Sequence, residues 1–324
     1  MSSVDTQLHA ALARALDGVP HHELRRRVTA LSNRYRFEQI DDCSPGMRDD
    51  LDALAYAVIR MPATFRALHA ALSAAERHVD ASFTTHLDLG GGTGAAAWAA
   101  ASVDPTISTE ILERQPAAIR LGKQLAAGNR WRWTTADLRQ WSRPSRPDQR
   151  EPAESVDLIT IGYVLNELSA ETRRTLIHAA ARTATTIVLV EPGTPHGHRR
   201  TLDARDLLLE HGFRIAAPCP HEGPCPTDWC HFAARLPRTE LHRVLKDGTR
   251  NYEEERFSYV VATRHPVRPA PARVIRRPAK PKGRVVLDLC TSAGAAQQMI
   301  VPKSSDAYRI ARDASWGDAW NQSS

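Results

Sequence analysis

The alternation of apolar and polar positions predicts a helical first quarter of the chain. Apolar side chains recur at helical spacing in three segments: Val4–Leu16, Glu23–Tyr35 and Met47–Ile59. Met61-Pro62 predicts a break, because the residue before a proline avoids the helical region, and Ala63–His78 predicts a further helix. We therefore predict a helical N-terminal cap over residues 1–80.

From residue 84 onward, short apolar runs alternate with helical patterns. The strand-like runs are Thr84–Leu89, Ile107–Leu112, Arg130–Thr135, Asp157–Ile161, Thr186–Val190, Phe213–Ala217 and Phe257–Thr263. The helical patterns are Ala95–Ala101, Pro116–Ala127, Ala170–Thr183 and Thr201–His211. This order predicts a doubly wound, Rossmann-like α/β domain over residues 81–263. The last two strands, joined by a long connection, predict an antiparallel hairpin at the sheet edge.

The end of the chain changes character. Residues 264–283 are rich in proline, arginine and lysine, which predicts a linker. Arg284–Leu289 and Ala296–Val301 then predict a small β element, and Asp306–Ala319 predicts a short helix. We therefore expect residues 264–324 to form a basic linker followed by a small C-terminal element.

The stretch His86-Leu-Asp-Leu-Gly-Gly-Gly-Thr-Gly94 joins the first strand of this domain to an Ala-rich helical segment. Gly90, Gly92 and Gly94 let the backbone approach a ligand closely, and the helix start offers unpaired N–H groups. Such a turn suits a dinucleotide or S-adenosylmethionine (SAM), whereas no Walker lysine for a nucleoside triphosphate follows. With Asp88 two residues upstream, the pattern resembles motif I of class I SAM-dependent methyltransferases.

Polar residues follow the next strands, at positions where that fold places cofactor contacts. Glu113 ends the second strand, where an acidic group accepts hydrogen bonds from ribose hydroxyls. Asp137 and Leu138 follow the third strand, where the fold usually contacts the adenine. Asn166 and Glu167 follow the fourth strand, at the mouth where the methyl acceptor would lie. Each residue alone is more often an exposed strand-end group. Together and in order, they favour a class I SAM-dependent methyltransferase fold.

The acceptor side of this expected site carries no recognisable catalytic motif. Base N-methylation often uses an Asn/Asp-Pro-Pro-aromatic loop after the fourth strand, whereas this chain has Gly162–Glu167 there. Cytosine C5 methylation needs a nucleophilic thiol, and no cysteine lies near the fourth or fifth strand. The pattern supports SAM binding and leaves the catalytic residues unknown.

Composition narrows the class of protein. Hydrophobic residues at 42% and charged residues at 25% are typical of a globular protein. No apolar run approaches the roughly 20 residues that span a bilayer, so no membrane partner is expected. Met1–Leu24 lacks a basic-then-apolar signal pattern. We therefore expect a cytoplasmic location, or an equivalent reducing compartment.

The positive charge of the chain is unevenly distributed. The net charge is +6, and Arg264–Arg284 holds eight Lys/Arg, five prolines and no acidic residue. One interpretation is a solvated linker. The other is an arm on phosphate backbone, where each contact releases counterions.

Three of the five cysteines, Cys219, Cys225 and Cys230, fall within twelve residues in the segment 218–232. A reducing compartment argues against a disulfide framework. Four prolines stiffen this loop, and thiolates on a rigid loop are good soft-metal ligands. The spacings are wider than in a typical zinc knuckle, with His221 or His231 able to complete a zinc site, and they suit a 4Fe-4S cluster.

A cluster needs a fourth ligand. Cys290, at the end of the apolar run Val285–Leu289, is the leading candidate and would attach the C-terminal element to the core. Cys43 is the rival, but its neighbours Asp41 and Asp42 disfavour additional negative charge. We predict that Cys290 is a ligand and that Cys43 is not.

These features together resemble the Rsm-twenty-two family, methyltransferase-like proteins of the mitochondrial small ribosomal subunit and their bacterial relatives. The similar segments are 31–36, Tyr56 to Pro62, 86–94, 191–195, 218–232, 284–290 and 316–318. The resemblance implies a role in small-subunit assembly or translation, with SAM, ribosomal RNA and ribosomal proteins as partners. It also implies a 4Fe-4S cluster on Cys219, Cys225, Cys230 and Cys290, and it favours phosphate contact for Arg264–Arg284.

Three functional hypotheses follow. The chain is a methyltransferase acting on small-subunit RNA or protein, or an RNA-binding assembly factor that keeps the fold for docking. The third is an iron–sulfur sensor that releases RNA when its cluster is lost. Methyl transfer onto immature small subunits separates the first two.

Overall fold

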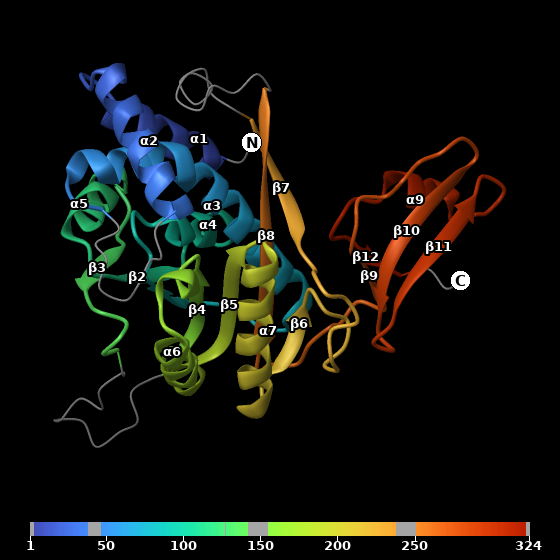
Figure 1. The fold of residues 1–324 in the computed structure, drawn as a ribbon. Helices are drawn as coiled ribbons and strands as arrows, with labels where there is room; N and C mark the ends of the chain where they lie inside the picture. Colours follow the sequence, from blue (N-terminus) through green and yellow to red (C-terminus); the bar gives the residue numbers. More distant parts are fainter. Residues whose placement is uncertain (1–2, 38–46, 127, 142–154, 238–250, 322–324) are drawn as a thin grey trace.

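The computed structural model describes residues 3–37, 47–126, 128–141, 155–237 and 251–321 (Figure 1). Its first three helices are α1 (Ser3–Ala15), α2 (His21–Phe37) and α3 (Asp50–His78).

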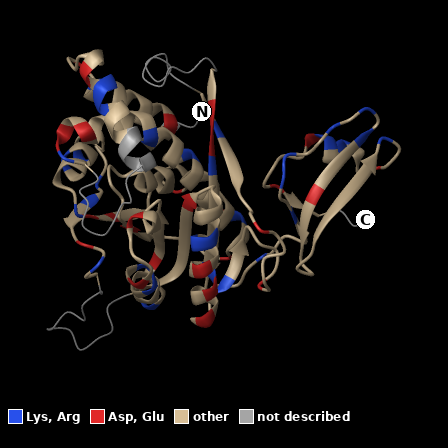
Figure 2. Cartoon of the chain, viewed as in Figure 1, with Lys and Arg blue, Asp and Glu red and all other residues tan. Residues whose placement is uncertain are grey.

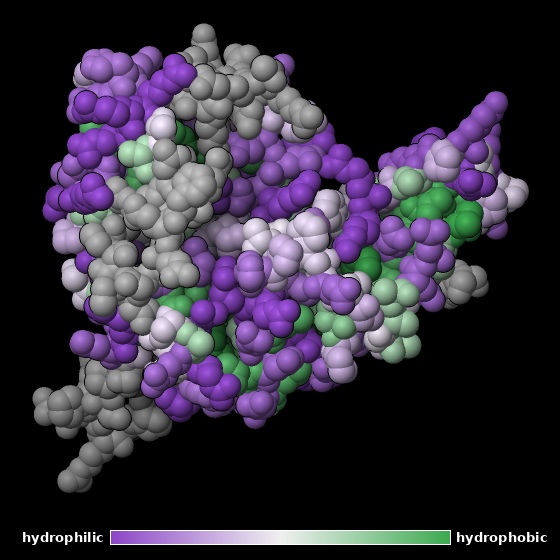
Figure 3. Space-filling view, in the orientation of Figure 1, coloured by the Kyte–Doolittle hydropathy of each residue, from purple (hydrophilic) through white to green (hydrophobic). Residues whose placement is uncertain are grey.

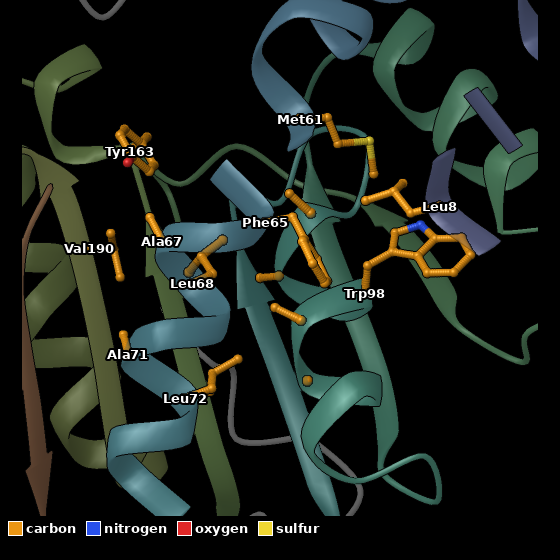
Figure 4. Close-up of a cluster of buried hydrophobic side chains, with 14 of the residues drawn as sticks. Leu8, Met61, Phe65, Ala67, Leu68, Ala71, Leu72, Trp98, Tyr163 and Val190 are labelled. Atoms are coloured by element: carbon orange, nitrogen blue, oxygen red, sulfur yellow. The ribbon is translucent and has the colours of Figure 1, made fainter. Parts of the chain in front are cut away.

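The predicted helix break at Met61-Pro62 is wrong, because α3 runs through Pro62 without interruption. A proline inside a helix costs about 3 kcal/mol or more. Met61, Phe65 and Leu68 are each about 1% exposed, and burying one such side chain stabilises by about 1.5–3 kcal/mol. Figure 4 shows these side chains on α3, with Trp98 of the neighbouring α4 across from Phe65. Tertiary packing on both sides of the proline therefore outweighs its cost.

A mixed sheet forms the centre of the molecule. Its strands are β1 (Thr85–Leu89), β2 (Ser108–Glu113), β3 (Arg132–Thr135), β4 (Val156–Gly162), β5 (Ala184–Pro192), β6 (Arg214–Ala217), β7 (Phe232–Pro237) and β8 (Tyr252–Thr263). The order is β3-β2-β1-β4-β5-β8-β6, with β7 also paired to β8. The pairs among β1 to β5 are parallel, and β8 is antiparallel to both of its sheet neighbours. This order confirms the predicted class I methyltransferase fold.

The predicted edge hairpin is only partly correct. β6 and β8 do pair antiparallel, but β8 lies inside the sheet between β5 and β6. β8 also extends far enough to pair with β7, a strand that the pattern did not predict.

Helices cover both faces of the sheet. The remaining ones in this domain are α4 (Ala95–Val103), α5 (Pro116–Leu125), η1 (Leu165–Glu167), α6 (Ala170–Thr183) and α7 (Pro195–Glu210). One apolar cluster joins α1 to α4 to one sheet face, and a second joins α6 and α7 to the other (Figure 1). The carboxyl ends of the parallel strands stay open between these layers.

The C-terminal element is a second, four-stranded sheet. It contains β9 (Ala272–Val274), β10 (Arg284–Thr291), β11 (Ala296–Pro302) and β12 (Ala319–Trp320), in the order β11-β10-β9-β12, with α9 (Tyr308–Asp313). It has its own apolar core and stands beside the β6–β8 side of the central sheet (Figure 1). β9 lies within the predicted linker, and the predicted helix over 306–319 is confined to α9.

The face of the molecule drawn in Figure 3 is mainly hydrophilic, as expected when apolar side chains are buried between the layers. Its hydrophobic groups lie on the C-terminal element and along the lower part of the central domain. Within the described ranges, no helix is long and apolar enough to cross a membrane.

Candidate functional site

The glycine turn follows β1 and is held by the end of β2. The backbone N–H groups of Gly90 and Gly91 donate to the carbonyl of Leu112 at 2.9 and 3.1 Å. Gly90 has a φ of +71°, and a Cβ there would lie 2.6 Å from Val164 Cγ2. Gly92, at φ +56°, has no atom within 4 Å of where its Cβ would be. The turn therefore requires glycine and presents open space at Gly92.

This open space is part of a cavity of about 100 Å³ at the carboxyl ends of β1 to β4. Its lining includes five of the predicted contacts: Gly90, Gly92, Glu113, Asp137 and Leu138. Asp88, Gly94 and Asn166 were predicted for the same site but are not part of the lining. We call this space the glycine-turn cavity.

Asp88 lies under the turn, with only 1% of its surface exposed. Its Oδ1 accepts a hydrogen bond from Thr160 Oγ1 at 2.8 Å, while Oδ2 has no partner among the described residues. Burial raises the pKa of Asp88 to about 7, against the hydrogen bond from Thr160. A Cβ on Gly91 would lie 2.2 Å from Asp88 Oδ2. The carboxyl group therefore supports the turn from below.

His86 belongs to the same buried network of hydrogen bonds as Asp88 and Thr160. Its two ring nitrogens lie 3.1 Å from Thr109 Oγ1 and 2.8 Å from Thr160 Oγ1. Burial lowers the pKa of His86 to about 3, so the imidazole is neutral. Thr160 links the histidine to Asp88, and both groups fix the end of β1 without reaching the cavity.

Glu113 both lines the cavity and holds the turn. Its Oε2 accepts from Gly92 N–H at 2.9 Å, and its Oε1 accepts from the N–H groups of Arg114 and Gln115 at 2.8 and 2.7 Å. Burial raises the pKa of Glu113, and these three hydrogen bonds oppose that shift. The carboxylate is thus held in a fixed position at the end of β2.

The other predicted contacts differ in their surroundings. Asp137 forms an ion pair with Arg139, whose hydrogen bond lowers the pKa of the Asp137 carboxyl. Leu138 Cδ1 lies 3.2 Å from the Cβ position of Gly90, so it packs against the turn. Gly94 begins α4 in the left-handed conformation, and Asn166 Oδ1 is buried without a hydrogen bond in the described part of the chain.

The pattern placed Glu167 at the mouth of the site, and this residue lines the cavity. It missed Tyr56 and Tyr163, which also form part of the cavity wall. Tyr163 has a φ of +61°, and its hydroxyl donates to Glu255 Oε1 at 2.9 Å. Arg60 donates to both oxygens of Glu255 at 2.9 and 3.2 Å. Tyr56 and Arg60 lie in the Tyr56–Pro62 segment of the family resemblance, whereas no sequence signal pointed to Glu255.

Glu167 adds a further carboxyl group to the cavity. Burial and, to a lesser extent, the negative charge of Glu113 together raise its pKa to about 7. Arg114 is the one cation in the lining within the part of the chain that the structure describes. Three acidic side chains, Glu113, Asp137 and Glu167, therefore give this cavity a predominantly acidic wall.

The cysteines line a second, smaller space, which we call the cysteine cavity. Cys219, Cys225, Cys230 and Cys290 all contribute to its wall, with Arg273 beside them. The first three come from the loop between β6 and β7, and Cys290 comes from β10. Cys290 Sγ lies 3.4 Å from His221 Nε2. The chain thus brings the four predicted ligands to one place.

The thiols in this cavity have raised pKa values. Burial, with smaller contributions from the charges of Cys219 and Cys225, raises the pKa of Cys290 to about 12. Burial likewise raises the pKa of Cys230. Among the described residues, no group of three or more His, Cys, Asp or Glu side chains is close enough to hold a metal ion. The cavity wall offers four thiols as possible donors, and Cys43 lies outside the described residues.

The basic segment Arg264–Arg284 is more structured than a linker. Arg264 donates to Ala181 O, Arg268 pairs with Asp80, and Arg277 donates to Glu254 at 2.7 Å. Arg273 and Arg276 donate to backbone carbonyls. Five of its eight cations therefore have partners within the fold.

The remaining three cations lie at one end of the C-terminal element. Lys280, Lys282 and Arg284 are exposed, and Lys303 joins them because its N–H donates to Gly283 O at 2.8 Å. No ion pair involves these four residues in the described part of the chain. Figure 2 shows Lys and Arg segments at the loops of this element. We call these four residues the basic tip.

A family model described as mitochondrial small ribosomal subunit Rsm22 matches residues 50–321. The chain belongs to the Rsm22 family. The match runs from α3 to β12, so it includes the glycine-turn cavity, the cysteine cavity and the C-terminal element. The family resemblance predicted from the sequence is confirmed.

Named relatives agree with this membership. The human ribosome assembly protein METTL17, mitochondrial, is 30% identical over 253 residues, covering 72% of this chain and 54% of the relative. The Rsm22-cox11 tandem protein 2, mitochondrial, of Schizosaccharomyces pombe is 27% identical and covers 83% of this chain and 43% of the relative. The chain thus spans about half the length of these relatives. Both relatives are named as mitochondrial proteins, so the predicted cytoplasmic location is wrong.

Solved methyltransferase structures resemble the chain only at low scores. A putative RNA methyltransferase from Pyrococcus horikoshii has a TM-score of 0.38 and 13% identity, covering 74% of this chain and 95% of that one. Human N-acetylserotonin methyltransferase has a TM-score of 0.40 and 14% identity, with 79% and 70% covered. The fold assignment therefore rests on the strand order of the chain itself.

Proposed function

We propose that the protein is a methyltransferase-fold factor that acts in assembly of the small ribosomal subunit in mitochondria. The observation that carries this proposal is the family match over residues 50–321, which includes both sheets. A relative named as a ribosome assembly protein supports it. Depletion of the protein should lower the amount of assembled small subunit relative to the large one in sucrose gradients. An unchanged ratio would contradict the proposal.

The glycine-turn cavity is the proposed SAM site. Glu113 lines the cavity at the end of β2, where its carboxylate would accept hydrogen bonds from ribose hydroxyls, and Leu138 would provide an apolar wall for adenine. The acidic wall favours a cationic ligand, because opposite charges attract more strongly in a partly buried site. SAM would supply a methyl group on a sulfonium. The chain's own contribution is to bind and orient it.

The SAM proposal can be tested with two matched glycine variants. Gly92 and Gly128 both have a positive φ and no atom within 4 Å of a Cβ position, but only Gly92 lines the cavity. Gly92→Arg should abolish SAM binding in equilibrium dialysis, because the new side chain enters the cavity. Gly128→Arg carries a comparable backbone strain and should bind like the wild type. Equal binding by both variants would contradict the site.

The same two variants, Gly92→Arg and Gly128→Arg, can show whether the protein transfers a methyl group. The segment Gly162–Glu167 offers no cysteine, and Tyr163 is engaged with Glu255. We propose a binding role, in which immature small subunits acquire no label from tritiated SAM. Label that appears with wild type and Gly128→Arg, but not with Gly92→Arg, would establish an enzyme instead.

The basic tip is the proposed contact to ribosomal RNA, in place of the whole basic segment. Each phosphate contact lowers the slope of log affinity against log salt by about 0.7–0.9. Changing all four residues to glutamine should flatten this slope for purified small-subunit RNA by about 3. A control removes four exposed cations from other surfaces: Arg14, Lys123, Arg130 and Arg174. Equal losses in the two variants would show that only net charge matters.

The cysteine cavity is proposed to hold a metal centre on Cys219, Cys225, Cys230 and Cys290. Its donor set suits a 4Fe-4S cluster, with zinc as the alternative. Such a group would supply a rigid link between the loop and β10. Iron, sulfide and zinc analysis of anaerobically purified protein tests this, with Cys290→Ser expected to lose the centre and Cys43→Ser to keep it. Full metal content in Cys290→Ser would contradict the ligand set.

A further inference from the structure

Two arginines are buried beside the cysteine cavity. Arg205 of α7 and Arg273 of β9 are each only 3% exposed. Arg205 donates to the carbonyls of His221 and Gly223 at 3.3 and 2.9 Å. Arg273 donates to the carbonyl of Pro218 at 2.9 Å and lines the cavity itself. Both guanidinium groups thus hold the backbone of the cysteine loop.

Carbonyl oxygens accept most of the hydrogen bonds that the two arginines donate, and within the described ranges only one carboxylate, that of the exposed Asp206, is paired with these two positive charges. No Asp or Glu lines the cavity in the described part of the chain. Arg205 forms an ion pair at 2.9 Å with Asp206, whose side chain is 67% exposed, whereas Arg273 has no ion pair among the described residues. Arg205 Nε has no hydrogen-bond partner among the described residues. Burying an unpaired ion costs several kcal/mol, so buried charges are normally accompanied by opposite charges.

The groups that could provide this opposite charge are the four thiols. Arg273 lines the same cavity as all four of them. Arg205 holds His221 and Gly223, which lie between Cys219 and Cys225 in the loop. The two cations therefore lie beside the loop that carries three of the thiols, and Arg273 also shares the cavity wall with Cys290 of β10.

We propose that Arg205 and Arg273 are positioning residues that provide the counter-charge for a negatively charged four-thiolate metal centre. This rests on the metal centre proposed above. Four thiolates around a dicationic core, whether [4Fe–4S]²⁺ or Zn²⁺, leave a net charge of about −2, which two guanidinium groups offset. One cation comes from the central domain and the other from the C-terminal element. The charge balance is complete only when the two parts are docked.

Substitution by lysine separates two possible roles of Arg205 and Arg273. It keeps the positive charge, which a counter-charge role needs, and removes the guanidinium geometry, which a purely structural role needs. Arg205→Gln and Arg273→Gln remove the charge, whereas Arg205→Lys and Arg273→Lys keep it but lose the guanidinium fork that reaches two carbonyls. The glutamine variants should hold the centre about 10–100-fold more weakly, as is typical for partners of metal ligands. The lysine variants should recover most of this loss.

For an iron–sulfur centre, the readout is the reduction potential of the fraction of protein that retains the cluster. Each glutamine variant should have a more negative potential than the wild type, because a nearby positive charge favours the reduced, more negative cluster. This readout is independent of how much protein misfolds. For a zinc centre, the readout is zinc affinity in competition with a chromophoric chelator.

Arg173→Gln is the matched control, because Arg173 also donates to a backbone carbonyl, that of Leu168, but lies away from the cysteines. It should leave the potential and zinc affinity unchanged. Glutamine variants that behave like this control, or a loss that lysine does not restore, would overturn the counter-charge role alone. Wild-type protein without iron, sulfide or zinc would overturn the metal centre and this inference together.

Discussion

The glycine-turn cavity and the cysteine cavity differ in the charge of their walls. Glu113, Asp137 and Glu167 make the first predominantly acidic. The second has no acidic residue in its lining among the described residues, and Arg273 forms part of its wall. An acidic wall suits a cationic ligand, and a basic wall suits an anionic centre. The two cavities are therefore adapted to different kinds of ligand within one chain.

They also differ in how the chain builds them. The strand-end residues that carry the first cavity belong to β1 to β4, which the usual strand–helix alternation brings together. The second joins the 219–230 loop to Cys290, in a different sheet. The first cavity can therefore form within the central domain, whereas the second requires the C-terminal element to be docked.

The largest expected effect tests whether the cavities are independent. Gly92→Arg should weaken SAM binding more than 100-fold while leaving metal content unchanged. Cys290→Ser should do the reverse, because no residue belongs to both linings. Binding assays and metal analysis on both variants would measure this. If either variant disturbs both ligands, the two cavities are coupled and the comparison fails.

A smaller effect distinguishes the acidic residues of the first cavity. Glu113→Gln should weaken SAM binding about 10–100-fold, because charged hydrogen bonds contribute about 1.5–3 kcal/mol. Asp137→Asn should weaken it less than about fivefold, since Asp137 is engaged by Arg139. Isothermal titration calorimetry would measure both. Equal losses would show that only the total charge of the wall matters.

The acidic wall should also make stability depend on pH. The pKa of Glu167 in the folded protein is about 7, above the value of 4.5 for an isolated glutamate. The folded protein therefore holds this proton longer than the unfolded chain, so the free energy of unfolding falls as pH rises from about 4.5 to 7. Glu167→Gln should be about 1–2 kcal/mol more stable than wild type at pH 8 and equal to it at pH 4.

Urea unfolding at several pH values would measure this difference. The exposed Glu171→Gln serves as a control that should follow the wild type at every pH. Asp88, whose pKa is also raised to about 7, would keep part of the pH dependence in the Glu167 variant. A variant curve parallel to the wild-type curve would show that Glu167 is not the responsible group.

The smallest expected effect concerns the surface contact between the basic segment and the central domain. Arg268 pairs with Asp80, and their side chains are 69% and 55% exposed. Exposed ion pairs contribute about 0–1 kcal/mol. Arg268→Ala should therefore lower the free energy of unfolding by less than about 1 kcal/mol in thermal or urea denaturation. A larger loss would mean that this contact, rather than the cysteine cavity, secures the C-terminal element.

Local patterns predicted most of the central domain. Apart from β7 and the first part of β8, the strands and most helices of this domain lie within a few residues of their predicted positions, because apolar periodicity, glycine turns and prolines are local signals. α7 begins at Pro195 rather than Thr201, with Thr194 accepting from Gly197 N–H as its N-cap. That cap was readable in the sequence.

Long-range contacts explain what the pattern could not predict. The burial of both halves of α3 overrides Pro62. Glu255 reaches Tyr163 and Arg60 only because β8 is inserted beside β5. No spacing within the sequence marks such partners.

The candidate site residues also divide into those with a local sequence signal and those that depend on long-range contacts. Asp88 and Glu113 were identifiable as strand-end acids, but their support of the turn depends on contacts made in the folded sheet. The cysteines were visible from their spacing, whereas Arg205 and Arg273 had no local signal because their role depends on burial. The assignment of all four cysteines as ligands stays a prediction.

The position of β8 has a consequence for the order of biosynthesis. β6 pairs with β8, so the central sheet cannot close until residues 252–263 have left the ribosome that makes this protein. The cysteine cavity must wait longer, until Cys290 emerges. Because domains tend to fold from the N-terminus during synthesis, the two cavities would mature one after the other. Nascent chains in which residue 263 has left the ribosome and residue 290 has not should therefore already have a SAM site, while three cysteines still lack the fourth.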